Sequence, residues 1–125
     1  EYGTYLHKIF EVTDFLNITD ENPYKDQIKA FVKLLNITNK TSIYKEHEFV
    51  FDENDTTYHG IIDLILIEDD LIKIVDYKLK NIDDPKYIEQ LNVYCKYLKS
   101  IFNKQIKMYL YSIIDAKLKE VDIVA

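Results

Sequence analysis

The sequence predicts an α/β-class domain, more narrowly an α+β mixed sheet with flanking helices in the order α-α-β-β-β-α-β-β. Apolar residues recur at helical spacing up to about residue 35, and the period changes to two from Ser42. A long helical segment that begins at Pro85 then separates three strands from two more, which indicates a crossover within one sheet. The 125 residues, 47% of them hydrophobic, suffice for one core, so we expect a single domain over residues 1–125.

Two helices are expected ahead of the first strand. Thr4 is placed to cap a helix that runs to about Phe15. Asn22-Pro23 is placed to open a second helix, because proline suits the first helical turn. Four apolar residues of this second helix have the i, i+3, i+4, i+7 spacing of a buried stripe: Ile28, Phe31, Val32 and Leu35.

The rest of the chain alternates strands with one helix. The strands have alternating or continuous apolar patterns and are expected at residues 42–51, 58–67, 71–79, 106–113 and 117–123. A turn over residues 52–56 joins the first two strands, and a tight turn at Asp69-Asp70 joins the next two. The third helix is expected from Pro85 to about Phe102, and its inward residues are Leu91, Tyr94, Cys95 and Leu98.

Composition excludes several classes of protein. The net charge is −6, and all 16 basic residues are lysine, which disfavours a basic DNA-binding domain that reads bases with arginine. The single cysteine, Cys95, excludes an internal disulfide and a cysteine-held iron–sulfur or zinc cluster. Apolar runs are too short for a membrane span, so we expect no membrane partner and a cytoplasmic location. Because the chain starts at Glu1 without methionine, we expect it to be part of a longer protein.

Two carboxylates in the middle hairpin are the most informative residues. If Asp69-Asp70 is a two-residue turn, Asp63 and Asp76 face each other on neighbouring strands, with Cβ atoms about 5 Å apart. Their ionised forms would repel by about 3 kcal/mol at an effective dielectric constant near 20, and a shared divalent cation would remove that repulsion. Lys78 follows Asp76 by two residues, so both point to the same face. Two acids and a lysine on one face suit metal-assisted phosphodiester hydrolysis.

A second interpretation of these residues stays open. Asp76 and Lys78 could instead form a surface ion pair on an exposed strand face, with Asp63 at its rim. The assumed pairing also depends on an Asp-Asp turn, which is not among the favoured two-residue hairpin turns. The spacing alone therefore does not decide between a metal site and a surface pair.

Four short motifs in order along the chain resemble those of the PD-(D/E)XK nuclease superfamily. They are Gly3-x-x-x-His7, Gly60-Ile61-Ile62-Asp63, Ile74-Val75-Asp76-Tyr77-Lys78 and Gln90-Leu91-x-x-Tyr94. More narrowly, they resemble the C-terminal nuclease domain of RecB/AddA-type helicase–nucleases, which implies a restriction-endonuclease-like core. There are two departures: Ile62 replaces the proline of the motif name, and the four cysteines of AddB-type iron–sulfur relatives are missing.

The resemblance implies a role for each matching residue. Asp63 and Asp76 correspond to the acidic metal ligands, and Lys78 to the catalytic lysine. His7 corresponds to an additional metal ligand from the first helix, and the backbone carbonyl of Tyr77 to a further ligand. Three accessory or DNA-positioning candidates complete the set: Gln90, Tyr94 and, more weakly, Glu46. For Gln90 and Tyr94 a purely structural interpretation, a helix-to-sheet hydrogen bond and a core tyrosine, stays open.

The expected function is that of a Mg²⁺-dependent deoxyribonuclease domain, with Mn²⁺ as a substitute and no iron–sulfur cluster. The resemblance favours exonuclease over endonuclease action on single-stranded DNA or duplex ends, without sequence specificity, and the choice between the two stays open. It also implies a bacterial helicase–nuclease in double-strand-break repair, whose partners are the rest of a helicase chain and a further protein of the same complex. Two alternatives stay open: a catalytically weak nuclease-fold module for DNA binding or assembly, and a stand-alone restriction or phage-type nuclease.

Overall fold

The structure is a computed structural model that describes residues 2–79 and 82–122, with the side chains of residues 2–4 left out. Its helices and strands, in chain order, are α1 (Tyr2–Val12), α2 (Lys25–Leu34), β1 (Ser42–Glu53), β2 (Thr56–Ile67), β3 (Leu71–Lys78), α3 (Pro85–Lys99), β4 (Gln105–Ser112) and β5 (Lys117–Val121). This order is the predicted one. Within the described ranges, no helix combines the length and apolar content needed to span a bilayer.

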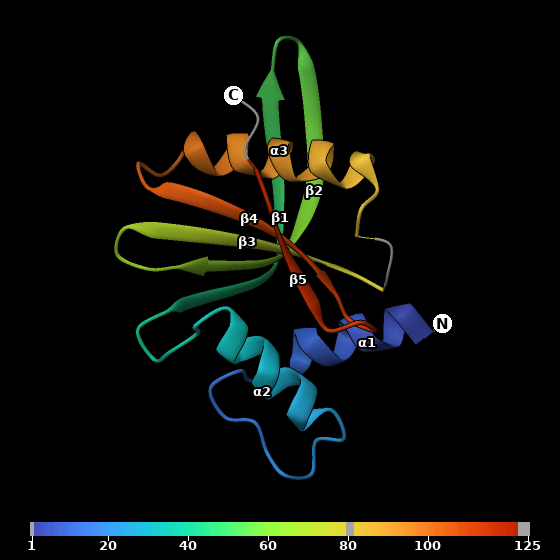
Figure 1. The fold of residues 1–125 in the computed structure, drawn as a ribbon. Coiled ribbons are helices and arrows are strands. Elements are labelled where there is room, and N and C mark those ends of the chain that lie inside the picture. Colours follow the sequence, from blue (N-terminus) through green and yellow to red (C-terminus); the bar gives the residue numbers. More distant parts are fainter. Residues whose placement is uncertain (1, 80–81, 123–125) are drawn as a thin grey trace.

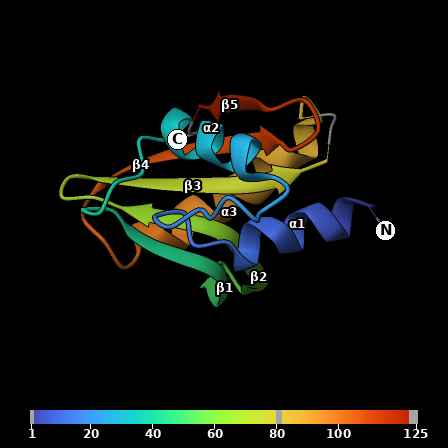
Figure 2. The same cartoon turned by 90° about the horizontal axis from the view of Figure 1, so that it is seen from below.

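The five strands form one mixed sheet in the order β1-β2-β3-β4-β5. Neighbouring strands are antiparallel except β3 and β4, which are parallel and joined through α3. Helices α1 and α2 cover one face of the sheet and α3 covers the other (Figures 1 and 2). The fold class is therefore confirmed as an α+β mixed sheet with flanking helices.

Strand β3 lies at the centre of the sheet between two apolar cores. Its even-numbered residues Ile72 and Ile74 pack beneath α3, whereas Val75 and Tyr77 pack against α1 and α2. Because both faces of β3 are covered, a charged side chain on it is removed from water unless it lies near the end of the strand. Asp76 lies in this buried stretch and is only 3% exposed.

The expected ends of both N-terminal helices need correction. Helix α1 begins at Tyr2, so Thr4 is inside the helix rather than its cap, and it ends at Val12 rather than near Phe15. It ends there because the side chain of Asp14 accepts a hydrogen bond from the backbone N–H of Leu16, which forms a local turn. Helix α2 begins at Lys25, two residues late, because the Asn22 side chain and carbonyl hold a turn with the next residues.

Several strand and turn boundaries also differ from prediction. The first hairpin has a two-residue turn at Asn54-Asp55, not a loop over 52–56, and both residues have positive φ, as in a type I′ turn. Helix α3 ends at Lys99 and not near Phe102. Strand β3 ends one residue early, at Lys78, and β4 lies one residue earlier than expected. Strand β5 ends at Val121, and its expected end at Ile123 lies outside the described residues.

Strands β1 and β2 bend together at one pair of residues. Lys45 contacts α1 and Phe15 on one side of the sheet, whereas His47, two residues later, contacts Tyr97 of α3 on the other. A regular strand would place residues 45 and 47 on the same face, so the alternation changes at Glu46. Glu46 has φ of 50°, in the left-handed region, which explains the change. From Glu46 onward the alternation is regular again, because Glu46 faces His7 of α1 whereas His47 and Phe49 both contact Tyr97 of α3.

Strand β2 also changes the face to which its side chains point, at the position opposite Glu46. Ile62 and Leu64 are both fully buried, yet Ile62 packs in the core under α3 and Leu64 in the core under α1 and α2. The β1–β2 pairing is in register before and after this point, but Glu46 and Asp63 are skipped. The hairpin beyond the bend projects past α3 (Figure 1).

Candidate functional site

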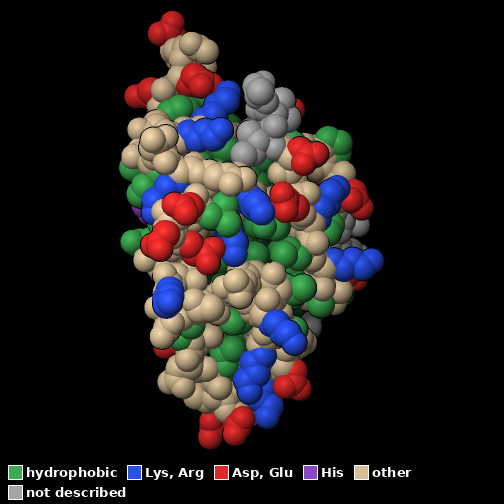
Figure 3. Space-filling view, turned by 60° about the vertical axis from the view of Figure 1, so that its left-hand side comes forward, with side chains coloured by type: hydrophobic (Ala, Val, Ile, Leu, Met, Phe, Trp, Pro, Cys, Tyr) green, Lys and Arg blue, Asp and Glu red, His purple; other side chains and the backbone are tan. Residues whose placement is uncertain are grey.

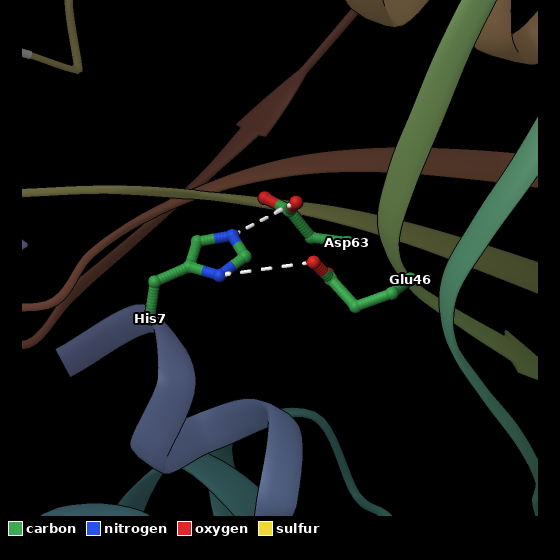
Figure 4. A group of neighbouring side chains, drawn as sticks. All are labelled: His7, Glu46 and Asp63. Carbon is green, nitrogen blue, oxygen red and sulfur yellow. Dashed lines mark ion pairs between the residues drawn. The ribbon is translucent and has the colours of Figure 1, made fainter. Parts of the chain in front are cut away.

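Three side chains from separate elements meet at the bend of β1 and β2. His7, on α1, lies between two carboxylates, with Nε2 2.9 Å from Asp63 Oδ1 and Nδ1 3.9 Å from Glu46 Oε1 (Figure 4). One ligand atom from each residue lies within 4.8 Å of the others. Glu46 and Asp63 are the two residues skipped by the β1–β2 pairing, so the bend is what turns their carboxylates toward α1.

Asp63 also occupies a gap between β2 and β3. The β2–β3 ladder has the predicted register, from Ile67 opposite Ile72 to Leu64 opposite Val75, and the turn at Asp69-Asp70 is confirmed. The ladder stops one residue short of the expected Asp63–Asp76 pair. Instead, Asp63 Oδ2 accepts a hydrogen bond of 2.8 Å from the backbone N–H of Tyr77. The carboxylate thus replaces a backbone acceptor at the point where the strands separate.

Asp76 and Lys78 form a close charge pair on β3. Lys78 Nζ lies 2.8 Å from Asp76 Oδ2, so the two groups form a close ion pair, although the angle of the contact is not that of a hydrogen bond. The Asp76 side chain is only 4% exposed and that of Lys78 21%. This degree of burial is inconsistent with an exposed surface pair at the rim of the sheet.

Two residues of α3 link Lys78 to the hairpin. Gln90 Oε1 lies 3.4 Å from Lys78 Nζ, and Gln90 Nε2 donates to the hydroxyl of Tyr94 at 2.7 Å. That hydroxyl in turn donates to the carbonyl of Ile61 on β2 at 3.1 Å. Tyr94 is therefore a core tyrosine with a helix-to-sheet hydrogen bond, and Gln90 also reaches the lysine, so the structural and the accessory interpretation each describe part of the arrangement.

The two aspartates have opposite pKa shifts. Burial raises the pKa of Asp76 to about 7, and the charge of Asp63 acts in the same direction, while Lys78 offsets part of the effect. Burial also disfavours ionised Asp63, but hydrogen bonds from His7, Asp76 and the Tyr77 N–H outweigh it and hold its pKa below the usual value. The hydrogen bond to Asp63 raises the pKa of His7. The metal-free site thus holds ionised Asp63 beside a readily protonated Asp76.

The donor set fits a divalent cation. His7 offers an imidazole nitrogen, and Glu46 and Asp63 offer carboxylate oxygens, the hard ligands that Mg²⁺ and Mn²⁺ prefer. The predicted ligand Asp76 is not part of this group, and its carboxylate contacts Lys78 on β3. One of the oxygens of this group, Glu46 Oε2, is buried without a hydrogen-bond donor, whereas Asp76 Oδ2 is buried against the Lys78 ammonium group. Buried carboxylate oxygens normally have partners, so Glu46 Oε2 is suited to an ion or to its bound water.

The sequence-based prediction did not include two residues that lie next to the site, Lys45 and Tyr87. Lys45 Nζ donates to the carbonyls of Phe10, Glu11 and Thr13 at the end of α1, next in sequence to Glu46. The ring of Tyr87 lies 4.3 Å from Lys78 Nζ. Tyr87 precedes Gln90 by three residues and Tyr94 by seven, so helical periodicity could have found it.

Comparison with known proteins finds two related sequences, and no family model matches the chain. Both relatives are described as subunits of an ATP-dependent helicase/nuclease. The one from Clostridioides difficile (strain 630) is 24% identical over 173 residues, covering 93% of this chain and 14% of the relative. The one from Clostridium acetobutylicum is 33% identical over 79 residues, covering 57% of this chain and 6% of the relative. The chain therefore spans a small part of these relatives and is similar to them at low identity.

Proposed function

We propose that this chain is a metal-dependent DNA nuclease domain of the PD-(D/E)XK type, part of a longer bacterial helicase–nuclease. The observation that carries the proposal is the meeting of His7, Glu46 and Asp63 beside the buried Asp76–Lys78 pair. The two related sequences, both named as helicase/nuclease subunits, support it. The partners that this proposal implies are DNA, the remainder of the helicase chain and a second protein of the same complex.

Asp63, Asp76 and His7 would hold Mg²⁺, or Mn²⁺ in its place, with the Tyr77 carbonyl and Glu46 as further oxygen donors. When bound, the cation would supply Lewis acidity at the phosphate and lower the pKa of a water molecule. Before it binds, His7 and Lys78 lie against the two aspartates and reduce their mutual repulsion.

Lys78 would orient the attacking water and stabilise the negative charge that develops on the phosphate. Its ammonium is directed toward the site by contacts from β3 and α3, so it does not need to reorganise during the reaction. Gln90 would act as a positioning residue, because its carbonyl oxygen faces Lys78 while its amide nitrogen is fixed by Tyr94.

The surface charge suits a nuclease that does not read sequence. The protein has a net charge of −6 and no arginine. On the face shown in Figure 3, lysine and acidic side chains are interspersed rather than gathered into a continuous basic surface. Local positive charge would therefore come from the bound cation and Lys78, and the rest of the helicase would hold the DNA.

The test is cleavage of end-labelled single-stranded and duplex DNA in Mg²⁺, with EDTA as the blank. Wild type should release labelled products, and both Asp63→Asn and Lys78→Met should slow the reaction by about 100-fold or more. The exposed pair Asp83–Lys119 has the same 2.8 Å contact, so Asp83→Asn and Lys119→Met are matched controls that should keep full activity. Equal activity of wild type and Asp63→Asn would refute the assignment.

A nuclease-fold module without turnover is the second candidate, and the net charge of −6 is the observation that favours it. Calorimetric titration with Mn²⁺ separates the two candidates. The nuclease proposal predicts binding that Asp63→Ala and Asp76→Ala abolish. A module without a metal site predicts no binding, or binding that neither substitution changes.

A further inference from the structure

Lys78 is held by three groups of different chemical kinds. They are the Asp76 carboxylate at 2.8 Å, the Gln90 side-chain oxygen at 3.4 Å and the ring of Tyr87, whose centroid lies 4.3 Å from Nζ. The carboxylate contact lacks hydrogen-bonding geometry, and 3.4 Å is long for an N–H···O bond. The Asp76 contact remains a close ion pair, and the Tyr87 ring is the other group positioned to fix the ammonium.

The start of α3 fixes the position of the Tyr87 ring. Asp84 caps the helix by accepting a hydrogen bond from the backbone N–H of Lys86, and Pro85 occupies the first helical position. The Tyr87 N–H bonds the carbonyl of Asp84 at 3.1 Å, and its side chain packs at the edge of the core under α3. Tyr87 and Gln90, three residues apart on one helical face, thus both present their side chains to Lys78.

An aromatic partner differs from a carboxylate in one respect that matters here. A ring face attracts an ammonium group through its quadrupole, but it is a poor ligand for Mg²⁺, which prefers oxygen. If Asp76 is drawn to a metal ion, its contact with Lys78 weakens. The Tyr87 ring keeps its attraction in either state, and it adds no negative charge that would oppose the incoming phosphate.

We propose that Tyr87 is a positioning residue that holds the Lys78 ammonium over its ring while the carboxylates bind metal. The inference deepens the proposed nuclease function and rests on it for the role of Lys78. A residue acting in this way should affect turnover and leave substrate and metal binding unchanged. Its effect should follow the electron density of the ring, because the cation–π attraction does.

The experiment replaces Tyr87 with phenylalanine, 4-fluorophenylalanine, 3,4,5-trifluorophenylalanine and leucine in the 125-residue chain. Cleavage of labelled DNA at saturating Mg²⁺ gives kcat and KM, calorimetry gives the Mn²⁺ Kd, and urea unfolding gives stability. Tyr87→Phe should stay within about two-fold of wild type, and kcat should fall stepwise with fluorination to about five-fold below wild type for Tyr87→Leu. KM and the Mn²⁺ Kd should not change. The matched control, Tyr97→Leu in the same helix, should lower stability without lowering kcat.

An unchanged kcat across the series would overturn the inference, as would a fall that follows stability alone. A second readout does not need turnover. In wild type with Mg²⁺, the ring current of Tyr87 should shift the Lys78 ε-methylene protons upfield, and Tyr87→Leu should remove the shift. If wild type does not cleave DNA, the nuclease proposal fails, while the presence or absence of this shift still decides where Lys78 is held.

Discussion

The raised pKa of Asp76 predicts that the metal-free protein loses stability as pH rises. Burial and the charge of Asp63 raise this pKa from 3.8 to about 7. The folded state therefore keeps a proton that the unfolded state releases. The stabilisation from this proton is fully present below pH 3.8 and is lost as pH rises through 7.

The magnitude follows from the shift. A displacement of about three pKa units corresponds to about 4 kcal/mol in total, of which about 2 to 3 kcal/mol is lost between about pH 5 and pH 8. The neutral amide introduced by Asp76→Asn mimics the protonated acid at every pH, so this variant should lack that part of the pH dependence. The shift of Asp63 is downward and its carboxyl is already ionised at pH 5, so it adds nothing in this interval.

The assay is urea unfolding of both proteins in EDTA at pH 5 and pH 8. The wild-type loss of unfolding free energy over this interval should exceed that of Asp76→Asn by about 2 to 3 kcal/mol. Asp83→Asn removes an exposed carboxylate whose pKa is lowered by Lys119, and it should leave the wild-type dependence unchanged. Equal losses in wild type and Asp76→Asn would refute the reasoning, because Asp76 would then titrate alike in both states.

Three further substitutions test the packing and geometry around the site. A Cβ on Gly60 would lie 2.6 Å from Cε1 of Phe49, so Gly60→Ala should lower the unfolding free energy by about 1–3 kcal/mol, and adding Phe49→Leu should recover part of that loss. An unchanged unfolding free energy of Gly60→Ala in urea would contradict the close contact. Glu46 has φ of 50°, so Glu46→Gly should be as stable as wild type or up to about 1 kcal/mol more stable, and it should bind Mn²⁺ more weakly in calorimetry. A larger loss of stability in Glu46→Gly than in Glu46→Ala would count against backbone strain. Lys45→Met removes three hydrogen bonds donated to the end of α1, which should lower the unfolding free energy by about 1–3 kcal/mol and weaken Mn²⁺ binding several-fold, because His7 on α1 is then less well fixed. The same result from Lys40→Met, at an exposed lysine, would show that the loss is not specific to Lys45.

The element order and the central register followed from the sequence for identifiable reasons. Apolar runs on both sides of Asp69-Asp70 fix how β2 and β3 pair, because a slip by one residue would exchange their faces. The same register is what predicts that Asp63 lies next to Asp76. The helix ends were less predictable, because they depend on local side-chain bonds such as those of Asp14 and Asn22.

The bend at Glu46 and Asp63 could not be predicted from the pattern. Asp63 is flanked by Ile61-Ile62 and Leu64-Ile65, which are apolar on both sides and so give no period that could reveal a change of face. The hydrogen bonds of Lys45 to the end of α1 could not be predicted for a different reason. Its long side chain reaches carbonyls more than 30 residues away in sequence, and no local motif records such a contact.

The central claim is that His7, Asp63 and Asp76 hold one divalent cation. The most direct test is anomalous scattering from crystals of the 125-residue chain soaked in Mn²⁺. We expect an anomalous peak in contact with these three residues, with Lys78 displaced from Asp76 toward Tyr87. Crystals without such a peak, in which His7 stays on Asp63 and Lys78 stays 2.8 Å from Asp76, would contradict the claim.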